Sequence, residues 1–343
     1  MTEPVTDPAT DVPTGPVVVL LDHHTVDGAP RLRPPVLELL TLARGLAAST
    51  GSPVHAVAVE PGLAQAAAEE LGRYGVARVH DVVLPGADPH LTPVVAEALT
   101  AVVRTDDASA VLLASTFENK EVAARLAVLT GAGVVSDATG VTQEDGVVVV
   151  SKTVFAGTWT TRCAITTPLA VVLVKANAVP AETVADPTTP QVEPHEVTVS
   201  PSALRATLVR RTERAASGRP ELAEAQTVVA GGRGTDGDFS PVEELADVLG
   251  GAVGATRVAT DEGWIGHESQ IGQTGVTISP QLYIGAGISG AVHHRGGMQA
   301  SGTIVAVNTD PESPIFEIAD FGIVGDLFTV LPQAAEEIRR LRG

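Results

Sequence analysis

The sequence predicts an α/β protein of two domains, each containing a parallel sheet. Short Val/Leu/Ala runs alternate with longer Ala/Leu/Glu segments of helical character, which is typical of β–α units. The chain has 343 residues, 44% of them hydrophobic, and this length favours two cores over one. Five prolines at positions 180, 187, 190, 194 and 201 interrupt the alternation, which then resumes. The interruption predicts that a domain boundary follows it.

The first domain is expected over residues 16–204. Residues 1–15 are rich in Pro, Thr and Asp and are expected to be disordered, because they contain too little apolar surface to offset the entropy of ordering. Apolar runs predict strands at 17–21, 54–59 and 111–114. Segments of helical character predict helices at 35–48, 62–71, 93–103 and 120–129.

A strand-rich stretch follows these β–α units. Residues 147–155, 158–166 and 169–175 are separated by Gly and Pro, and we expect them to form antiparallel strands. The five prolines then exclude a helix or a central strand, so the segment that contains them is expected at the surface or at a sheet edge. We place the start of the second domain at residue 205, and this domain extends to residue 343.

The second domain is predicted to be a Rossmann-like parallel sheet. Strands are expected at 227–230, 253–258, 282–284 and 304–307, with helices at 241–249, 289–298 and 331–341. Gly285, Gly287 and Gly290 match the G-x-G-x-x-G spacing, which lets a pyrophosphate approach the free N–H groups of the next helix. Ser289 is the predicted N-cap of that helix, and Asn308 closes the following strand, where a ribose contact would fall. The alternative is an ordinary tight turn between strand and helix.

Composition excludes several classes of function. The formal net charge of −19 argues against nucleic-acid binding. No apolar run approaches the roughly 18 residues that cross a bilayer, and the acidic N-terminus does not resemble a presequence, so we expect no membrane insertion and a cytoplasmic location in a bacterium. Cys163 is the only cysteine, which excludes an internal disulfide and a cysteine-ligated iron–sulfur cluster. Electron transfer would therefore need a bound organic cofactor.

Six segments in order carry a resemblance to a known family: GGRG at 231–234, GATR at 254–257, GQTG at 272–275, LYIGAGISGAVHH at 282–294, IVAVNTDPESPIF at 304–316 and ADFGIVGDL at 319–327. Together they resemble the alpha subunit of electron-transfer flavoprotein. The resemblance implies a heterodimeric electron carrier whose C-terminal domain binds FAD. It also implies a beta subunit that packs against the N-terminal domain and that holds AMP or a second FAD.

The resemblance assigns cofactor contacts residue by residue. Arg233 would bind phosphate, and Thr256 would place a hydroxyl at the cofactor. Asn308, Asp326 and Leu327 would contact the adenosine half. The pyrophosphate would lie at the start of the predicted helix, in contact with Ser289, Gly290, Ala291, Val292 and His293. The flavin ring would lie along the GQTG turn, in contact with Ile271, Gly272, Gln273 and Thr274. Turn formation and helix capping are the competing explanations for the polar residues among them.

Three residues are expected to tune the flavin potential, and no residue is expected to be catalytic. The resemblance places Arg257 close to the ring, Thr274 near N5 and His294 at the pyrimidine end. At His294, an added hydrogen-bond donor or positive charge would complement negative charge on the reduced ring. His293 and His294 are adjacent on a predicted helix and point about 100° apart, so we expect no metal site there.

The expected function is an electron carrier with no substrate turnover of its own. It would accept electrons from flavin dehydrogenases, such as the acyl-CoA dehydrogenases of fatty acid β-oxidation, and pass them to a quinone-linked oxidoreductase. Two alternatives stay open. One is an NAD-dependent dehydrogenase that uses the glycine pattern at 285–290, and the other is a non-redox nucleotide-binding module.

Overall fold

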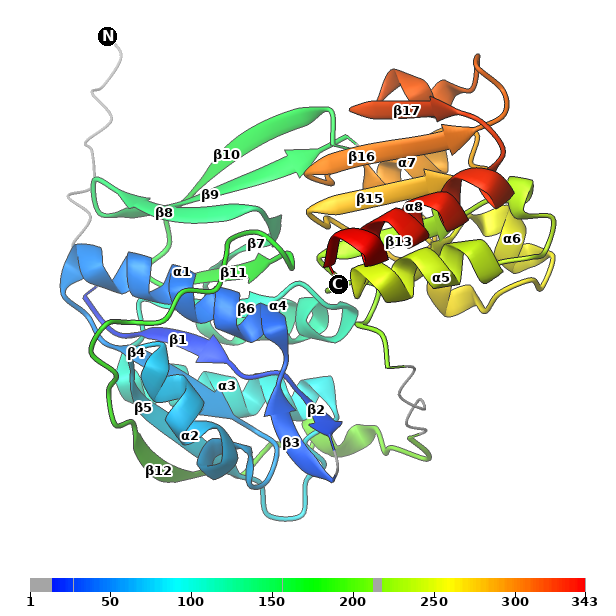
Figure 1. Ribbon diagram of the computed structural model, residues 1–343. Coiled ribbons are helices and arrows are strands. Elements are labelled where there is room, and N and C mark those ends of the chain that lie inside the picture. Colours follow the sequence, from blue (N-terminus) through cyan, green and yellow to red (C-terminus); the bar gives the residue numbers. More distant parts are fainter. Residues whose placement is uncertain (1–13, 27, 156, 212–217, 343) are drawn as a thin grey trace, which may run out of the picture. The chain divides into compact units, whose positions relative to one another are not determined.

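The computed structural model describes residues 14–342 except 27, 156 and 212–217. The chain divides into two compact units, Met1–Lys152 with Thr161–Arg211, and Thr153–Thr160 with Thr212–Gly343. Both units are α/β, as predicted (Figure 1). Most of the segment predicted to be disordered lies outside the described residues. Gly15, at its end, accepts a hydrogen bond from the Ser109 hydroxyl through its carbonyl oxygen.

The first unit contains a seven-stranded sheet with helices on both faces. The strand order is β12-β5-β4-β1-β6-β11-β7, and the paired strands run parallel. One apolar cluster packs α1 and α2 against the sheet, and a second packs α3 and α4 against its other face. The elements are β1 Val17–Leu20, α1 Pro34–Thr50, β4 Val54–Ala58, α2 Leu63–Arg73, β5 Val76–Val83, α3 Thr92–Asp106, β6 Ala110–Ala114, α4 Phe117–Thr130, β7 Gly133–Ala138, β11 Ala170–Val174 and β12 Gln191–Glu196.

Smaller elements complete this unit. A hairpin of β2 His23–Val26 and β3 Ala29–Leu32 follows β1, and a short 3-10 turn, Ala203–Arg205, follows β12. A separate three-stranded sheet contains β8 Gly140–Glu144, β9 Val147–Val154 and β10 Trp159–Ile165, in the order β10-β9-β8. Most of its residues belong to the first unit, and the end of β9 and the start of β10 belong to the second. The strands predicted at 147–155 and 158–166 are present as β9 and β10, and β9 pairs antiparallel with β8, a strand that was not predicted.

The prediction that residues 169–175 join the antiparallel strands is wrong. They form β11, which lies between β6 and β7 in the large sheet and pairs parallel with both. All five residues of β11 are buried and apolar, as is typical of a parallel strand that is covered on both faces. The proline-rich segment does supply an edge strand: Pro194 lies in β12 at the end of the sheet. The apolar-run criterion missed β5, in which buried and more exposed residues are mixed.

The second unit contains a five-stranded parallel sheet in the order β14-β13-β15-β16-β17, which confirms the Rossmann-like prediction. Helices α5, α6 and α8 share one apolar cluster with the sheet, and α7 belongs to the cluster on the other face. The elements are β13 Thr227–Gly231, α5 Ser240–Leu249, β14 Ala252–Ala255, α6 Arg257–Asp261, β15 Leu282–Ala286, α7 Val292–Met298, β16 Thr303–Asn308, β17 Phe321–Val324 and α8 Leu327–Arg342, with 3-10 turns at Arg233–Thr235, His267–Ser269 and Pro314–Glu317.

This strand order fixes where a ligand can bind. The chain starts at β13, adds β14 on one side, and then places β15, β16 and β17 on the other side. In doubly wound sheets the crevice for ligands lies beyond the carboxyl ends of the strands at this change of direction. The crevice of the second unit is therefore expected where the loops after β13 and β15 diverge.

Three predicted boundaries in this unit need correction. The helix expected at 289–298 begins only at Val292, after an N-cap residue, Ala291, with no side-chain cap. Gly290 has φ +81° and the Ser289 carbonyl accepts a hydrogen bond from the Ile315 amide, so Ser289 belongs to the preceding turn. The strand expected at 253–258 ends at Ala255 because α6 begins two residues later, and the last helix begins at Leu327 instead of residue 331.

Among the described residues, no helix combines the length and apolar character needed to cross a membrane.

Candidate functional site

A cavity of about 530 Å³ lies at the carboxyl edge of the second sheet. Loops after β13, β14, β15, β16 and β17 line it, so it occupies the crevice that the strand order indicates. The cavity is lined by most of the site residues that were predicted from the sequence: Arg233, Thr256, Arg257, Ile271, Gly272, Thr274, Ser289, Ala291, His293, His294, Asn308, Asp326 and Leu327.

Three predicted residues do not line the cavity. The Gln273 side chain accepts a hydrogen bond from Nδ1 of His293 at 2.9 Å, which holds the GQTG turn to α7. A Cβ on Gly290 would lie 2.6 Å from the Ile315 nitrogen, so this glycine allows two loops to meet. Val292 is 62% exposed. Gln273 and Gly290 therefore hold loops around the cavity together, and no such contact with the described residues is seen for the Val292 side chain.

Two glycines bring the loops after β13 and β15 into contact at the cavity. The Gly234 amide donates to the Gly287 carbonyl at 3.0 Å. A Cβ on Gly287 would lie 2.7 Å from the Gly234 Cα, and Gly287 has φ +62°, a conformation that disfavours any other residue. Gly285 is different, because a Cβ there would meet the Tyr283 ring at 2.8 Å. Gly287 is therefore the glycine of the G-x-G-x-x-G pattern that shapes the cavity.

One polar atom in the cavity wall lacks a partner. The hydroxyl of Thr256 is buried and forms no hydrogen bond with the part of the chain that the structure describes. Leaving a buried hydroxyl unpaired costs about 1–3 kcal/mol. Since Thr256 lines the cavity, a bound group with a hydrogen-bonding atom at this position would satisfy it.

A chain of side-chain hydrogen bonds orients the Thr274 hydroxyl. Thr260 donates to Oε1 of Gln270 at 3.0 Å, and Nε2 of Gln270 donates to Oγ1 of Thr274 at 3.0 Å. Because the Thr274 oxygen is the acceptor in this chain, its own O–H remains available to donate. Gln270 was not among the predicted site residues, and no local motif distinguishes it from other polar loop residues.

His294 is buried at the base of the cavity with both ring nitrogens engaged. Nδ1 lies 3.2 Å from the carbonyl oxygen of Ile271, which can only accept, so Nδ1 carries the proton. Nε2 lies 2.7 Å from the Tyr283 hydroxyl and accepts its hydrogen bond. Burial raises the pKa of Tyr283, so its hydroxyl keeps its proton.

The expectation of a positive charge at His294 is not supported. Burial lowers the pKa of His294 to about 4, and its hydrogen bond to Ile271 opposes this shift only in part. The ring is therefore neutral at neutral pH. The expected donor role at the cavity would require one of its two present hydrogen bonds to be exchanged.

Charged and polar side chains are distributed around the opening of the cavity. Arg233 and Arg257 supply positive charge, and Nε of Arg257 lies 3.1 Å from Asp261. Asp326 accepts a hydrogen bond from the Phe328 amide at the start of α8, so it has a capping role. The Asn308 amide donates to the carbonyl of Ile288, which connects the ends of β15 and β16.

Several lining residues were not predicted from the sequence: Gly234, Val258, Gln270, Ile288, Val307, Thr309, Asp310, Ser313 and Gly325. Most of them lie in the loops that follow the strands, within a few residues of a strand end. The signal that identifies them is their position at the carboxyl edge of the sheet, which requires the strand order.

Comparison with known proteins covers both units. The family model described as "Electron transfer flavoprotein domain" matches residues 18–201, and the one described as "Electron transfer flavoprotein FAD-binding domain" matches residues 221–299. The chain is similar to the electron transfer flavoprotein subunit alpha of Mycobacterium leprae, with 43% identity over 329 residues that span 95% of this chain and 99% of the relative.

Similar proteins are also found in two other organisms. The subunit alpha of Bacillus subtilis is 38% identical over 283 residues, which are 81% of this chain and 85% of the relative. The mitochondrial subunit alpha of Dictyostelium discoideum is 54% identical over 126 residues, which are 36% of each chain. The similarity therefore extends over nearly the whole chain in the mycobacterial relative and is highest over a shorter stretch in the eukaryotic one.

Proposed function

Because the chain belongs to the electron transfer flavoprotein alpha-subunit family and binds FAD, we propose that it is the FAD-binding subunit of a heterodimeric electron carrier. It pairs with a beta subunit and accepts electrons from flavin dehydrogenases, such as the acyl-CoA dehydrogenases of fatty acid β-oxidation. It delivers them to a quinone-linked oxidoreductase in the bacterial cytoplasm. The observation that carries this proposal is the match of the FAD-binding model to residues 221–299, which supply much of the cavity wall.

The residues around the cavity fit the chemical parts of FAD. Arg233, together with main-chain amides of the loops after β13 and β15, is suited to the pyrophosphate, since charged donors form strong hydrogen bonds to phosphate oxygens. Asn308, Asp326 and Leu327 would hold the adenosine half. The unpaired Thr256 hydroxyl and the close glycine contact between the two loops support a bound group at this place.

The bound flavin supplies uptake of electrons in pairs and their release one at a time. The protein's contribution is electrostatic. Arg257 places a positive charge at the cavity, which favours added negative charge on a bound group. The Thr274 hydroxyl, oriented by Gln270, offers a donor. His294 offers a neutral, buried ring whose orientation Tyr283 and the Ile271 carbonyl fix.

Thr256→Val is expected to weaken FAD binding while leaving the flavin-free protein at least as stable. Valine keeps the shape of threonine and removes a hydroxyl that has no partner without the cofactor. The lost hydrogen bond predicts an affinity lower by about tenfold, or roughly 1.5 kcal/mol. Fluorescence titration with FAD measures the affinity, and urea unfolding of the flavin-free chain measures the stability. Thr256→Ser, which keeps the hydroxyl, serves as the control, and equal affinity in both variants would contradict a role for this oxygen.

Reduction of the bound flavin by a flavin dehydrogenase in the presence of that enzyme's substrate tests the proposed function. A nicotinamide-dependent dehydrogenase would hold no flavin to reduce and would instead bind NADH, and a non-redox nucleotide-binding module would bind an adenine nucleotide without any redox change. The three functions therefore predict different outcomes.

A further inference from the structure

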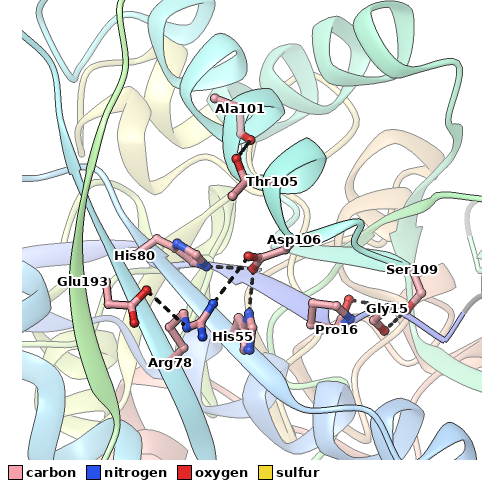
Figure 2. Close-up of polar contacts among 10 residues, drawn as sticks. All are labelled: Gly15, Pro16, His55, Arg78, His80, Ala101, Thr105, Asp106, Ser109 and Glu193. Atoms are coloured by element: carbon pink, nitrogen blue, oxygen red, sulfur yellow. Dashed lines mark hydrogen bonds and ion pairs between the residues drawn. The ribbon is translucent and has the colours of Figure 1, made fainter.

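Two buried histidines of the first unit approach one carboxylate oxygen of a buried aspartate (Figure 2). Nδ1 of His55 lies 2.6 Å and Nε2 of His80 lies 2.7 Å from Oδ2 of Asp106. The exposed fractions of the three side chains are 9%, 3% and 3%. Each histidine is hydrogen-bonded to Asp106.

The fold brings these residues together from three elements. The register of β4 and β5 pairs His55 with Arg78, and His80 lies two residues further along β5, so it shares the same face of the sheet. Helix α3 packs in the apolar cluster on this face, and Asp106 is its last residue. His55 lies near the start of β4 and His80 near the middle of β5. The three residues are too far apart along the chain to form a local sequence motif.

The charges around the cluster leave an excess of negative charge. Asp106 and Glu193 are carboxylates, and between them lies Arg78, with one nitrogen 3.9 Å from Asp106 and Nε 3.4 Å from Glu193. The ring of His195, on β12, stands edge-on to His80 at 5.6 Å. With neutral imidazoles these groups carry a net charge of −1, and a divalent cation would reverse it to +1.

We propose that His55, His80 and Asp106 bind one Zn²⁺ ion, with water as the fourth ligand. The three ligand atoms all lie within 4.8 Å of one another. Two imidazoles and a carboxylate are a ligand set that zinc accepts in tetrahedral geometry. Bonds of about 2.0–2.1 Å place tetrahedral ligand atoms roughly 3.3 Å apart, so the two histidine–aspartate contacts would open by about 0.6 Å.

Binding replaces two hydrogen bonds with metal bonds and needs no net release of protons. Each imidazole nitrogen that now donates to Asp106 must offer a lone pair to the metal, so its proton moves to the other ring nitrogen. Arg78 stays beside the carboxylates and limits the positive charge that the site tolerates. This favours a single ion over a two-metal centre.

The expected role of this ion is structural. Zn²⁺ has no redox chemistry, and His55, His80 and Asp106 do not line the cavity of the second unit. It would connect the end of α3 to β4 and β5. Because a ligand that binds only the folded chain stabilises it, zinc should raise the unfolding temperature of the first unit.

The experiment uses the full chain, freed of metal by dialysis against EDTA and then equilibrated with Zn²⁺. We expect one zinc ion per chain by mass spectrometry of the metal content and an unfolding temperature several degrees higher than with EDTA. Co²⁺ in place of Zn²⁺ should give the visible bands of a tetrahedral nitrogen–oxygen site. A thiolate charge-transfer band would instead assign the metal to Cys163 and overturn the proposal.

Variants locate the ion. His80→Gln should lower the zinc affinity at least tenfold, while His24→Gln, which changes an exposed histidine of the β2–β3 hairpin, should leave it unchanged. If His80→Gln does not fold, His55→Gln provides the same test with the more exposed of the two ligands. No zinc uptake by the unaltered chain, or equal uptake by His80→Gln or His55→Gln, would overturn the proposal.

Discussion

Gly287→Ala is expected to reduce the affinity for FAD by at least about tenfold. A Cβ at this position would lie 2.7 Å from the Gly234 Cα and 2.9 Å from a methyl group of Leu327, both of which belong to residues that line the cavity. The backbone must also hold φ +62° with a side chain, which costs roughly 1–2 kcal/mol. The loop after β15 would have to move away from the loop after β13, and this movement would disturb the proposed pyrophosphate contacts.

A matched control separates this effect from backbone strain alone. Gly263 has φ +73°, but a Cβ there would meet no atom within 4 Å, and it does not line the cavity. Gly263→Ala should therefore lower the unfolding temperature without changing the FAD affinity. Both variants are titrated with FAD, and the quenching of flavin fluorescence measures their affinities. Equal affinities for the two variants would show that the contact between the loops does not shape the site.

His294→Gln is expected to remove a large part of the acid sensitivity of the flavin-free chain. Burial lowers the pKa of His294 to about 4 from its ordinary value of 6.5. Between these values the unfolded chain binds a proton that the folded chain rejects, so the free energy of unfolding falls as the pH falls. The loss amounts to about 2 kcal/mol near pH 5 and about 3 kcal/mol once the pH is below 4. The full stability is present above pH 6.5.

Urea unfolding at several pH values measures this dependence. Burial also lowers the pKa of His80, but His80 is present in both proteins, so the difference between wild type and His294→Gln isolates His294. His293→Gln alters the neighbouring exposed ring and should retain the wild-type slope. A His294→Gln slope equal to that of wild type would mean that the ring is protonated or exposed in the folded chain.

Local sequence patterns predicted the parallel sheets because an apolar run between helical segments has few other ways to be buried. The same patterns failed for β11, because its pairing with β6 and β7 depends on the arrangement of the whole sheet and not on its own residues. Ser289 fits an N-cap by residue type, yet its carbonyl is engaged by Ile315 from a later turn. Such contacts depend on which loops meet in the folded protein, and the local sequence does not contain that information.

The candidate site, too, could be predicted only in part from the sequence. The family resemblance identified residues on each loop, and the strand order explains why those loops share one edge of the sheet. The resemblance did not reveal the charge of His294, because its protonation depends on burial and on the hydrogen bond to the Ile271 carbonyl. Gln270 was missed for a similar reason: its importance comes from the two threonines that it connects.

The cluster of His55, His80 and Asp106 was also not predicted from the sequence. Its residues come from β4, β5 and α3, and each by itself resembles an ordinary polar residue. Only the register between the strands and the end of the helix brings them to a single point.

The most direct test of the proposed carrier function follows the visible absorption of the flavin in the chain purified with its beta subunit. We expect the absorption to bleach when a catalytic amount of an acyl-CoA dehydrogenase and its acyl-CoA substrate are both present, and to recover when a quinone-linked oxidoreductase and quinone are added. Omission of the dehydrogenase should prevent bleaching, and NADH alone should leave the flavin oxidised. Bleaching by the acyl-CoA substrate or by NADH without the dehydrogenase, or no bleaching with any flavin dehydrogenase, would contradict the carrier function.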